Sequence, residues 1–401
     1  MKNNISLFII SFLATALGGT VSTLMSVYLP VVMHELAGIN GQEEFNRISG
    51  YINAVFIIGW TAGGFLSGIL SDRIGRKLSL VCTIACFGLA TFLTGMMNGW
   101  EGIVACRFFS GFGVGGIMVI STTYMTEVWP EKNRAIFIGI LSISFPIGIF
   151  SAGLINNLVP NWREGFYIGF VPLIIAIAGL ALLKESEIWK SARHLAIAGT
   201  DHQSKLFNKQ NSHALLLGAV TFGTMLIGLW GVFSWLPTWV QSLIVNGDGQ
   251  EERGISMMLL GMGGLTGGFV SGWLANAIGL RKSMLICFAA CAVLSLILFK
   301  TNTVFNPFAI YVEIGLLSLF FGASQGILSV FVPLLFPVAV RASATGFCFN
   351  IGRIFTALAV LFVGVLVTKL GGYGNSLLIF SLVFLGGLIA LFLTKEKSKV
   401  S

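Results

Sequence analysis

Three ionisable side chains lie within long apolar stretches of the sequence: Arg107, Glu313 and Arg353. A charged group inside a membrane is costly, so such a residue usually faces a pathway through the protein. A guanidinium group can bind a carboxylate through two parallel hydrogen bonds. A carboxyl group whose exposure alternates can take up a proton on one side and release it on the other. These residue types predict an anion site served by a proton carrier.

Arg353 is the strongest candidate for holding an anion. It follows Arg341, near which an apolar stretch begins, by a distance of about 18 Å along a helix, which places it near the middle of a membrane. Asn350 lies about one turn earlier. We expect both residues to bind an anionic substrate; a structural arginine bonded to the carbonyls of a broken helix is the alternative.

Arg107 and Glu313 each lie about six residues into an apolar stretch, at near-equivalent places in the two halves of the chain. We expect them to face one another, or the substrate, and we expect Glu313 to carry the proton. Glu35, at the end of the first apolar stretch, is a second candidate for proton coupling, although a solvated helix end explains it as well.

Several polar or aromatic residues are candidates for lining a substrate cavity. Gln325 could bond the solute from the middle of its apolar stretch. For the aromatic residues, lipid contact or packing explains their presence equally well. The additional substrate-binding candidates are Gln325, Tyr28, Tyr124 and Trp235.

The elements that position these residues are membrane-spanning helices. With 55% hydrophobic and 10% charged residues and a mean hydropathy of +0.89, the chain is too apolar for a soluble domain. Its apolar blocks are long enough to cross a bilayer, for which about 20 residues are needed. The first block is too long for a cleavable signal peptide. We therefore predict an all-α membrane protein with twelve spans, near residues 6–33, 49–71, 78–98, 101–126, 135–158, 165–183, 214–244, 254–276, 283–300, 307–335, 342–368 and 374–394.

The positive charges alternate between the loops. With the N-terminus inside, most Lys and Arg residues fall in segments on the inner side, as expected for cytoplasmic loops. Both termini are therefore predicted to be cytoplasmic. This topology also explains the net charge of +8 without nucleic acid, because the basic residues are spread over several loops.

The chain repeats itself. Gly68-Ile-Leu-Ser-Asp72-Arg73-Ile-Gly75-Arg76-Lys77 follows the second span, and a similar segment from Gly272 to Lys282 follows the eighth. Because six spans were duplicated, both copies enter from the same face and are parallel, and their interface is the natural place for a solute site. We predict an N-terminal six-helix bundle over 1–183, a cytoplasmic linker with one amphipathic turn over 184–213, and a C-terminal six-helix bundle with a short tail over 214–401.

The segment from Gly68 to Lys77 resembles the signature loop of the major facilitator superfamily. Charged side chains at such a loop can make charge-assisted bonds to the ends of neighbouring helices. The resemblance implies a cluster that latches the outward-open state and releases as the two halves rock; positive-inside anchoring alone is the alternative. The residues expected to form this cluster are Gly68, Asp72, Arg73, Gly75, Arg76, Lys77, Glu127 and Arg134.

A second resemblance concerns the substrate. The pattern Trp162-Arg163 with Phe166, Gly169 and Pro172 is similar to that of organic-anion and sialate-type symporters, and so is the entry to the eleventh span, from Phe336 to Arg353. This implies proton-coupled uptake of a carboxylated metabolite or acidic sugar by a monomer in a bacterial inner membrane.

Other function classes stay open at this point. An efflux antiporter is less favoured, because Phe145-Pro146-Ile-Gly148 lacks the longer glycine pattern of drug antiporters. A uniporter for a neutral or amphipathic solute, a lipid flippase and a transport-like receptor are further alternatives. No enzyme motif is present, and the pairs Cys82/Cys86 and Cys287/Cys291 lack His or acidic partners, so we expect neither a metal nor a cofactor.

Overall fold

The computed structural model describes residues 2–36, 42–196, 209–245, 247–336 and 341–393. Within these ranges all regular structure is helical, with no strand. Twelve helices are long and apolar enough to cross a membrane, one at each predicted segment. The prediction of an all-α protein with twelve membrane spans is confirmed.

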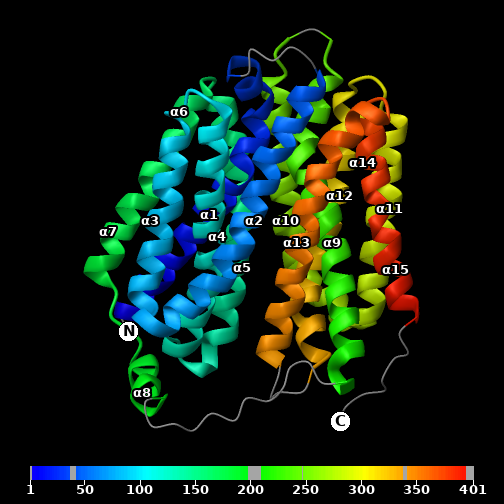
Figure 1. The fold of residues 1–401 in the computed structure, drawn as a ribbon. Helices are drawn as coiled ribbons and strands as arrows, with labels where there is room; N and C mark the ends of the chain where they lie inside the picture. Colours follow the sequence, from blue (N-terminus) through cyan, green and yellow to red (C-terminus); the bar gives the residue numbers. More distant parts are fainter. Residues whose placement is uncertain (1, 37–41, 197–208, 246, 337–340, 394–401) are drawn as a thin grey trace. The chain divides into compact units, whose positions relative to one another are not determined.

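The chain forms two compact units, and we describe each by itself. The first unit contains residues 1–203 and 236–261. Its helices are α1 (Lys2–Leu36), α2 (Gln42–Ile74), α3 (Arg76–Thr94), α4 (Trp100–Val128), α5 (Glu131–Leu158), α6 (Trp162–Phe166), the 3-10 turn η1 (Tyr167–Gly169), α7 (Phe170–Leu182) and α8 (Glu187–Ala196) (Figure 1).

The second unit contains residues 204–235 and 262–401. It takes up parts of α9 (Lys209–Ser242) and α10 (Gln250–Ile278), followed by α11 (Leu280–Thr301), α12 (Pro307–Leu334), α13 (Arg341–Lys369), α14 (Tyr373–Ser381) and α15 (Val383–Leu393). The last membrane span combines α14 and α15. The C-terminal part of α9 (236–242) and the N-terminal part of α10 (250–261) thus belong to the first unit.

The predicted linker contains more helix than expected. Instead of one amphipathic turn, α8 extends from Glu187 to Ala196, and α9 already begins at Lys209. Residues 197–208 lie outside the described part of the chain. The division into 1–183, 184–213 and 214–401 stays a prediction.

Close packing of α2 against α4 depends on glycine. A Cβ atom on Gly63 would lie 1.9 Å from the carbonyl oxygen of Phe112, and one on Gly115 would lie 2.0 Å from that of Trp60. Such contacts leave no room for a side chain, so the two backbones touch. In the second unit, α10 and α12 pack in the same way, with Gly322 against the Gly264 carbonyl oxygen.

The duplicated loop recurs in the backbone. Gly75 precedes α3 with φ of 105°, and Gly279 precedes α11 with φ of 87°. These angles lie in the region that favours glycine. Both turns therefore need the same residue at the same place in the repeat.

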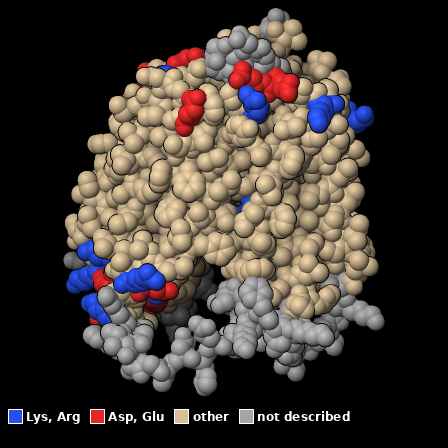
Figure 2. All heavy atoms as spheres, viewed as in Figure 1, with Lys and Arg blue, Asp and Glu red and all other residues tan. Residues whose placement is uncertain are grey.

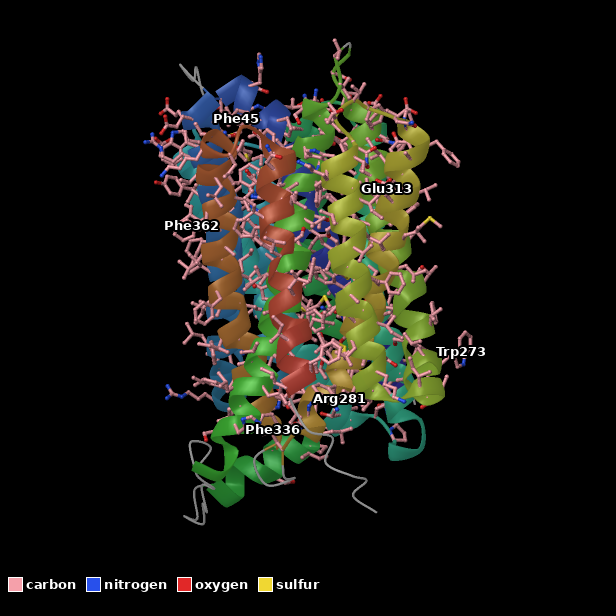
Figure 3. All side chains as sticks on the ribbon, turned by 90° about the vertical axis from the view of Figure 1, so that its right-hand side faces the viewer. Phe45, Trp273, Arg281, Glu313, Phe336 and Phe362 are labelled. Atoms are coloured by element: carbon pink, nitrogen blue, oxygen red, sulfur yellow. The ribbon has the colours of Figure 1, made fainter. Side chains whose placement is uncertain are left out.

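The charge pattern agrees with a membrane protein. On the face shown in Figure 2, the side chains of Lys, Arg, Asp and Glu gather toward the two ends of the helices, and the atoms between them are almost all of other residues. Large apolar side chains are exposed on the outer faces of the helices; Trp273, for example, is 74% exposed (Figure 3). Such a belt fits the hydrocarbon core of a bilayer.

Candidate functional site

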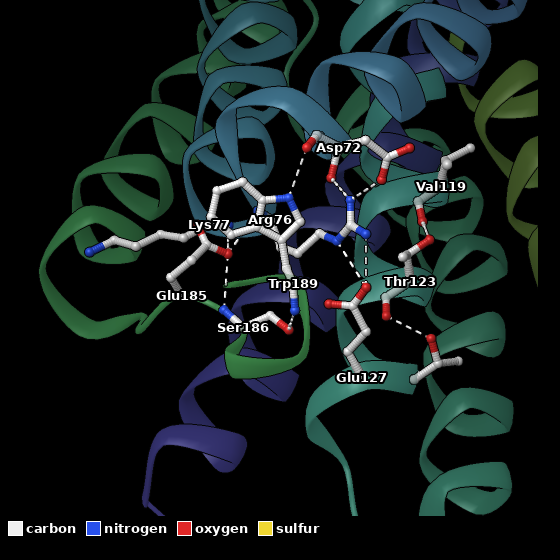
Figure 4. A network of polar contacts seen from close by, with 11 residues as sticks. Asp72, Arg76, Lys77, Val119, Thr123, Glu127, Glu185, Ser186 and Trp189 are labelled. Carbon is white, nitrogen blue, oxygen red and sulfur yellow. Dashed lines mark hydrogen bonds and ion pairs between the residues drawn. The ribbon is translucent and has the colours of Figure 1, made fainter. Parts of the chain in front are cut away.

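Arg76 is the centre of a polar network at one end of the first unit (Figure 4). Its Nη1 donates to Asp72 Oδ1 at 2.5 Å and to Ser71 Oγ at 3.1 Å. Its Nη2 lies 2.9 Å from Oε1 of Glu127, which also accepts from Nε at 3.0 Å. One guanidinium group therefore joins the end of α2 to the end of α4.

The most buried ion pair of this network joins Arg76 and Glu127. Their side chains are 11% and 14% exposed, whereas that of Asp72 is 71% exposed. Charges that are shielded from water interact more strongly than exposed ones. The Arg76–Glu127 pair therefore contributes more to holding α2, α3 and α4 together than the Arg76–Asp72 pair does.

Glu185 completes the network from the segment that follows α7. Its carboxylate accepts from the backbone N–H of Arg76 at 2.8 Å and from that of Lys77 at 3.2 Å. These N–H groups belong to the first turn of α3, where backbone donors have no partner inside the helix. An anion at this end also interacts favourably with the helix dipole. Glu185 therefore caps α3 from a distant part of the chain.

Trp189 attaches α8 to the same place. Its indole Nε1 donates to the backbone oxygen of Asp72 at 2.9 Å, and the side chain is buried. Ser186 Oγ in turn accepts from the backbone N–H of Trp189 at 3.2 Å and so caps α8. The start of the predicted linker is thus docked on the end of α2, next to the turn that leads into α3.

Sequence reasoning missed Glu185, Ser186 and Trp189. A signal was available: α3 begins after Gly75, which has no side chain to cap it, so an external acceptor was needed. The pattern Glu-Ser followed by Trp, directly after a span, offered an acid, a helix cap and a buried anchor. Nothing in the sequence, however, indicates that this segment returns to α3.

The other predicted gating residues lie differently. Arg73 is exposed, and Lys77 points away from the carboxylates in Figure 4. Gly68 approaches only the side chain of Val119, where a Cβ atom would lie 3.9 Å away. The side chain of Arg134 is outside the described part of the structure. From the predicted set, the network thus brings together the side chains of Asp72, Arg76 and Glu127, and Lys77 joins it through its backbone N–H.

Arg107 lies on α4, one turn before the close contact between Gly111 and α2, and is 1% exposed. Its Nη1 donates to the carbonyl oxygen of Val21 at 3.0 Å and its Nη2 to that of Ser22 at 3.4 Å. The guanidinium carbon lies 3.9 Å from the centre of the Phe56 ring. These contacts tie α4 to α1 and α2. That Arg107 faces Glu313 or the substrate stays a prediction.

Glu35 lies near the C-terminal end of α1 and forms a clamp with Trp162 and Arg163. One carboxylate oxygen accepts from Trp162 Nε1 at 2.5 Å, and the other accepts from Arg163 Nε at 3.1 Å. Arg163 also donates to the backbone oxygen of Met97 at 2.8 Å. The Trp-Arg pair of the predicted substrate motif therefore binds Glu35 and joins α1, α6 and the loop after α3.

Three predicted cavity aromatics are fully buried and bonded to backbone oxygens. Tyr28 donates to Val159 at 2.6 Å, Tyr124 donates to Lys184, and Trp235 donates to Val360 at 3.3 Å. Each bond fixes one chain segment to another. These contacts describe packing; a role in substrate binding stays a prediction for all three.

The second unit carries Arg353, Asn350 and Gln325. Arg353 is half-buried and donates to Asn350 Oδ1 at 3.2 Å, while Asn350 Nδ2 donates to the Gly346 oxygen at 2.9 Å. On α12, the buried Nε2 of Gln325 has no hydrogen-bond partner among the described residues. A buried donor without a partner is unfavourable, so this amide is well suited to a ligand.

Glu313 lies on α12 and is labelled in Figure 3. It is half-buried, and its Oε2 accepts from Asn302 Nδ2 at 2.7 Å. Asn302 directly follows the last residue of α11. Among the described residues, no group of three His, Cys, Asp or Glu side chains could hold a metal ion. The side chains of these candidate residues can bind an anion, form amide hydrogen bonds and exchange a proton at a carboxyl group.

Known proteins resemble this chain over most of its length. The profile of the Major Facilitator Superfamily matches residues 7–357. A cis,cis-muconate transport protein of Acinetobacter baylyi is 25% identical, over 97% of this chain and 94% of that protein. The sialic acid transporter NanX of Escherichia coli is 27% identical, over 85% and 83%. The crystal structure of a D-xylose-proton symporter shares the fold with a TM-score of 0.81 at 17% identity, covering 98% of each chain.

Proposed function

The chain belongs to the Major Facilitator Superfamily, and from this premise we propose that it takes up a small organic anion by alternating access, coupled to protons. That it is a multi-pass membrane transporter rather than an enzyme follows from the family and from the twelve spans. The anionic substrate, the coupling and the direction are our proposal. We further propose that both termini are cytoplasmic, in a bacterial inner membrane.

The observation that carries this proposal is the pair of Arg353 and Asn350. Arg353 lies on a membrane-spanning helix, and its guanidinium group donates a hydrogen bond to the neutral amide of Asn350. An ionisable side chain within a membrane span is costly and usually has a function. The function that best suits a guanidinium group is binding an anion. Asn350 orients it for the incoming carboxylate.

The relatives support an anionic substrate. By their names, one carries cis,cis-muconate and another sialic acid, and both compounds have carboxylate groups at neutral pH. A carboxylate is therefore the feature common to these substrates, and the binding residue we assign to it is Arg353.

Glu313 is our candidate for the proton carrier. Glu35 already accepts bonds from two side chains that hold helices together, so its protonation would disturb the clamp. Glu313 accepts a hydrogen bond from one side chain of the described part of the chain, that of Asn302, and is half-buried on a helix of the unit that holds Arg353. A single amide partner is easily exchanged when the helices move.

We propose that the Arg76 network acts as a latch. It joins helix ends of the first unit through ionic bonds that can be broken and remade, which is what a two-state element requires. The resemblance of this loop to the family signature indicates the same role. Docking of α8 through Trp189 would transmit movement of the linker to the latch.

The test is uptake by the full-length protein in proteoliposomes. Muconate and sialic acid, both labelled, are offered with and without an inward proton gradient. We expect at least one to accumulate with the gradient, and Arg353→Gln to abolish accumulation. Arg47→Gln is the control, because Arg47 is exposed and pairs only with Glu44 on its own helix among the interactions described. Unchanged affinity in Arg353→Gln would refute the assignment.

A further inference from the structure

The side of α13 that carries Arg353 is opposite to its outward-facing side. Residues nine positions apart in a helix are separated by about two and a half turns and so lie on opposite sides. Arg353 is nine residues before Phe362, which is 56% exposed and lies on the outer side of α13 in Figure 3. Phe349 is likewise nine residues before Leu358, which is 47% exposed. The partial exposure of Arg353 and Phe349 is therefore directed away from lipid.

Phe349 presents a flat surface next to Arg353. The two residues are four positions apart, so their side chains are neighbours on one face of the helix. The ring of Phe349 stacks on that of Phe222 in α9, with centroids 4.0 Å apart and an angle of 17° between the planes. Phe222 is only 6% exposed, whereas Phe349 is half-buried. Phe222 thus supports one face of the Phe349 ring, and the exposed part belongs to the other face and the edge.

Backbone packing holds this arrangement in place. A Cβ atom on Gly352 would lie 3.0 Å from Cα of Gly223, so α9 and α13 are in close contact next to Arg353. Gly223 follows Phe222 directly, and Gly352 precedes Arg353 directly. The same crossing therefore fixes both the ring stack and the start of the arginine side chain.

There is also space and unused hydrogen-bonding capacity on this side. A Cβ atom on Gly346, which lies one turn from Phe349 and Asn350, would have no neighbour within 4 Å. Thr345 Oγ1 is buried and has no hydrogen-bond partner among the described residues, as is the case for Gln325 Nε2. Gln325 lies about 13 Å along α12 from its end at Leu334, and Asn350 lies about 13 Å along α13 from its start at Arg341, so the two residues are at similar depth.

We propose that Phe349 determines substrate specificity: Arg353 holds the carboxylate, and the open face of Phe349 stacks on a flat conjugated group attached to it. This inference rests on the proposed function and adds to it the shape of the anion. The carrier thus selects flat, unsaturated carboxylates over saturated ones of equal charge and similar size. We assign to a polar group elsewhere on the molecule the unpartnered atoms of Thr345, one turn before Phe349 on α13, and of Gln325, at similar depth on α12.

The physical reason is the geometry of π-systems. Two flat rings interact by about 0.5–1.5 kcal/mol beyond the gain from buried area. A saturated ring of the same size buries a similar area but has no π face and is not flat. Its carboxylate can still reach Arg353, so the charge alone does not discriminate between the two.

Benzoate and cyclohexanecarboxylate form a matched pair of probes, because they share the charge and the number of carbon atoms. Their dissociation constants are measured by calorimetry on the full-length protein in detergent. We expect wild type to bind benzoate about threefold to tenfold more tightly. Phe349→Leu should reduce this ratio to about one, chiefly by weakening benzoate, and Phe349→Tyr should keep it.

Phe362→Leu is the matched control: it makes the same change on the same helix, on the side facing lipid, and should leave the ratio unchanged. Thermal unfolding of each variant shows whether it is folded, and Phe349→Tyr tests the ring even where leucine is poorly tolerated.

A preference for benzoate that survives in Phe349→Leu would overturn the inference. Equal binding of both acids to wild type would overturn it as well, while leaving an Arg353-dependent organic-anion carrier intact. Failure of wild type to bind either acid would also overturn it, and uptake of muconate or sialic acid would then decide the proposed function by itself.

Discussion

The carboxylate of Glu185 occupies the space that a side chain on Gly75 would fill. A Cβ atom at Gly75 would lie 2.3 Å from Glu185 Oε2, and Glu185 uses its position to accept bonds from the first two N–H groups of α3. The glycine of the signature loop therefore has two roles: it allows a φ of 105°, and it admits the cap of the following helix. This relationship makes separate predictions for the two residues.

Glu185→Gln should lower stability by about 0.5 kcal/mol, the usual effect of a charge lost at the start of a helix. The amide keeps the size of the side chain but loses the charge that suits the start of a helix. The measurement is thermal unfolding of the purified protein. Glu187→Gln is the matched control, because the Glu187 side chain is 82% exposed and forms an ion pair with Lys190 only, among the described residues. Equal effects of the two changes would contradict the capping role.

Gly75→Ala should destabilise the protein more than Gly279→Ala. Both glycines have positive φ, so both variants share a backbone strain of about 1 kcal/mol. Only Gly75 has a neighbour in the way, because a Cβ atom on Gly279 would meet nothing within 4 Å. The difference between the two unfolding temperatures isolates the clash with Glu185.

The clash can be tested further with a double variant. Glu185→Ala removes the atoms that a methyl group on Gly75 would strike, so Gly75→Ala should cost less in that background than in wild type. Additive effects of the two changes would show that Glu185 and Gly75 do not interact.

Arg76→Gln should destabilise the first unit by about 3 kcal/mol, because it leaves the mostly buried carboxylate of Glu127 without its partner. Adding Glu127→Gln should recover much of the loss, since two neutral side chains then replace an unpaired charge. Arg73→Gln changes an exposed residue and should alter stability by less than about 0.5 kcal/mol. Thermal unfolding of the three variants provides the comparison, and a double variant as unstable as Arg76→Gln alone would argue against a coupled pair.

The sequence predicted the helices well, because their signal is local. A membrane span needs only a run of apolar residues, and each predicted run contains a helix. The positive φ of Gly75 and Gly279 likewise follows from a repeated turn, in which each copy needs the same residue. The types of residue in the Arg76 network were predictable for the same reason, since Asp72 and Arg76 lie only four positions apart in the sequence.

Contacts between distant segments could not be predicted in this way. Glu185 binds the start of α3 across 109 positions, and no periodicity in the sequence connects the two. Tyr28 and Trp235 are candidates for lining a cavity, and nothing in the sequence reveals that their polar atoms bond to the backbone oxygens of Val159 and Val360. An aromatic residue with a polar tip suits either task, and only its tertiary neighbours decide between them.

The two glutamates proposed for proton coupling can be separated by the same substitution at each. Glu313→Gln removes the group that we assign to the proton, so it should abolish accumulation of substrate under a proton gradient while leaving exchange across the membrane at equal concentrations. Glu35→Gln weakens a clamp whose Arg163 and Glu35 side chains are 24% and 47% exposed, so it should cost only about 0.5 kcal/mol of stability and preserve accumulation. Uptake and exchange of the same labelled substrate in proteoliposomes distinguish the two outcomes. Accumulation that persists in Glu313→Gln but is lost in Glu35→Gln would transfer the coupling role to Glu35, because the ion pair with Arg163 would then be the element that opens and closes with the proton.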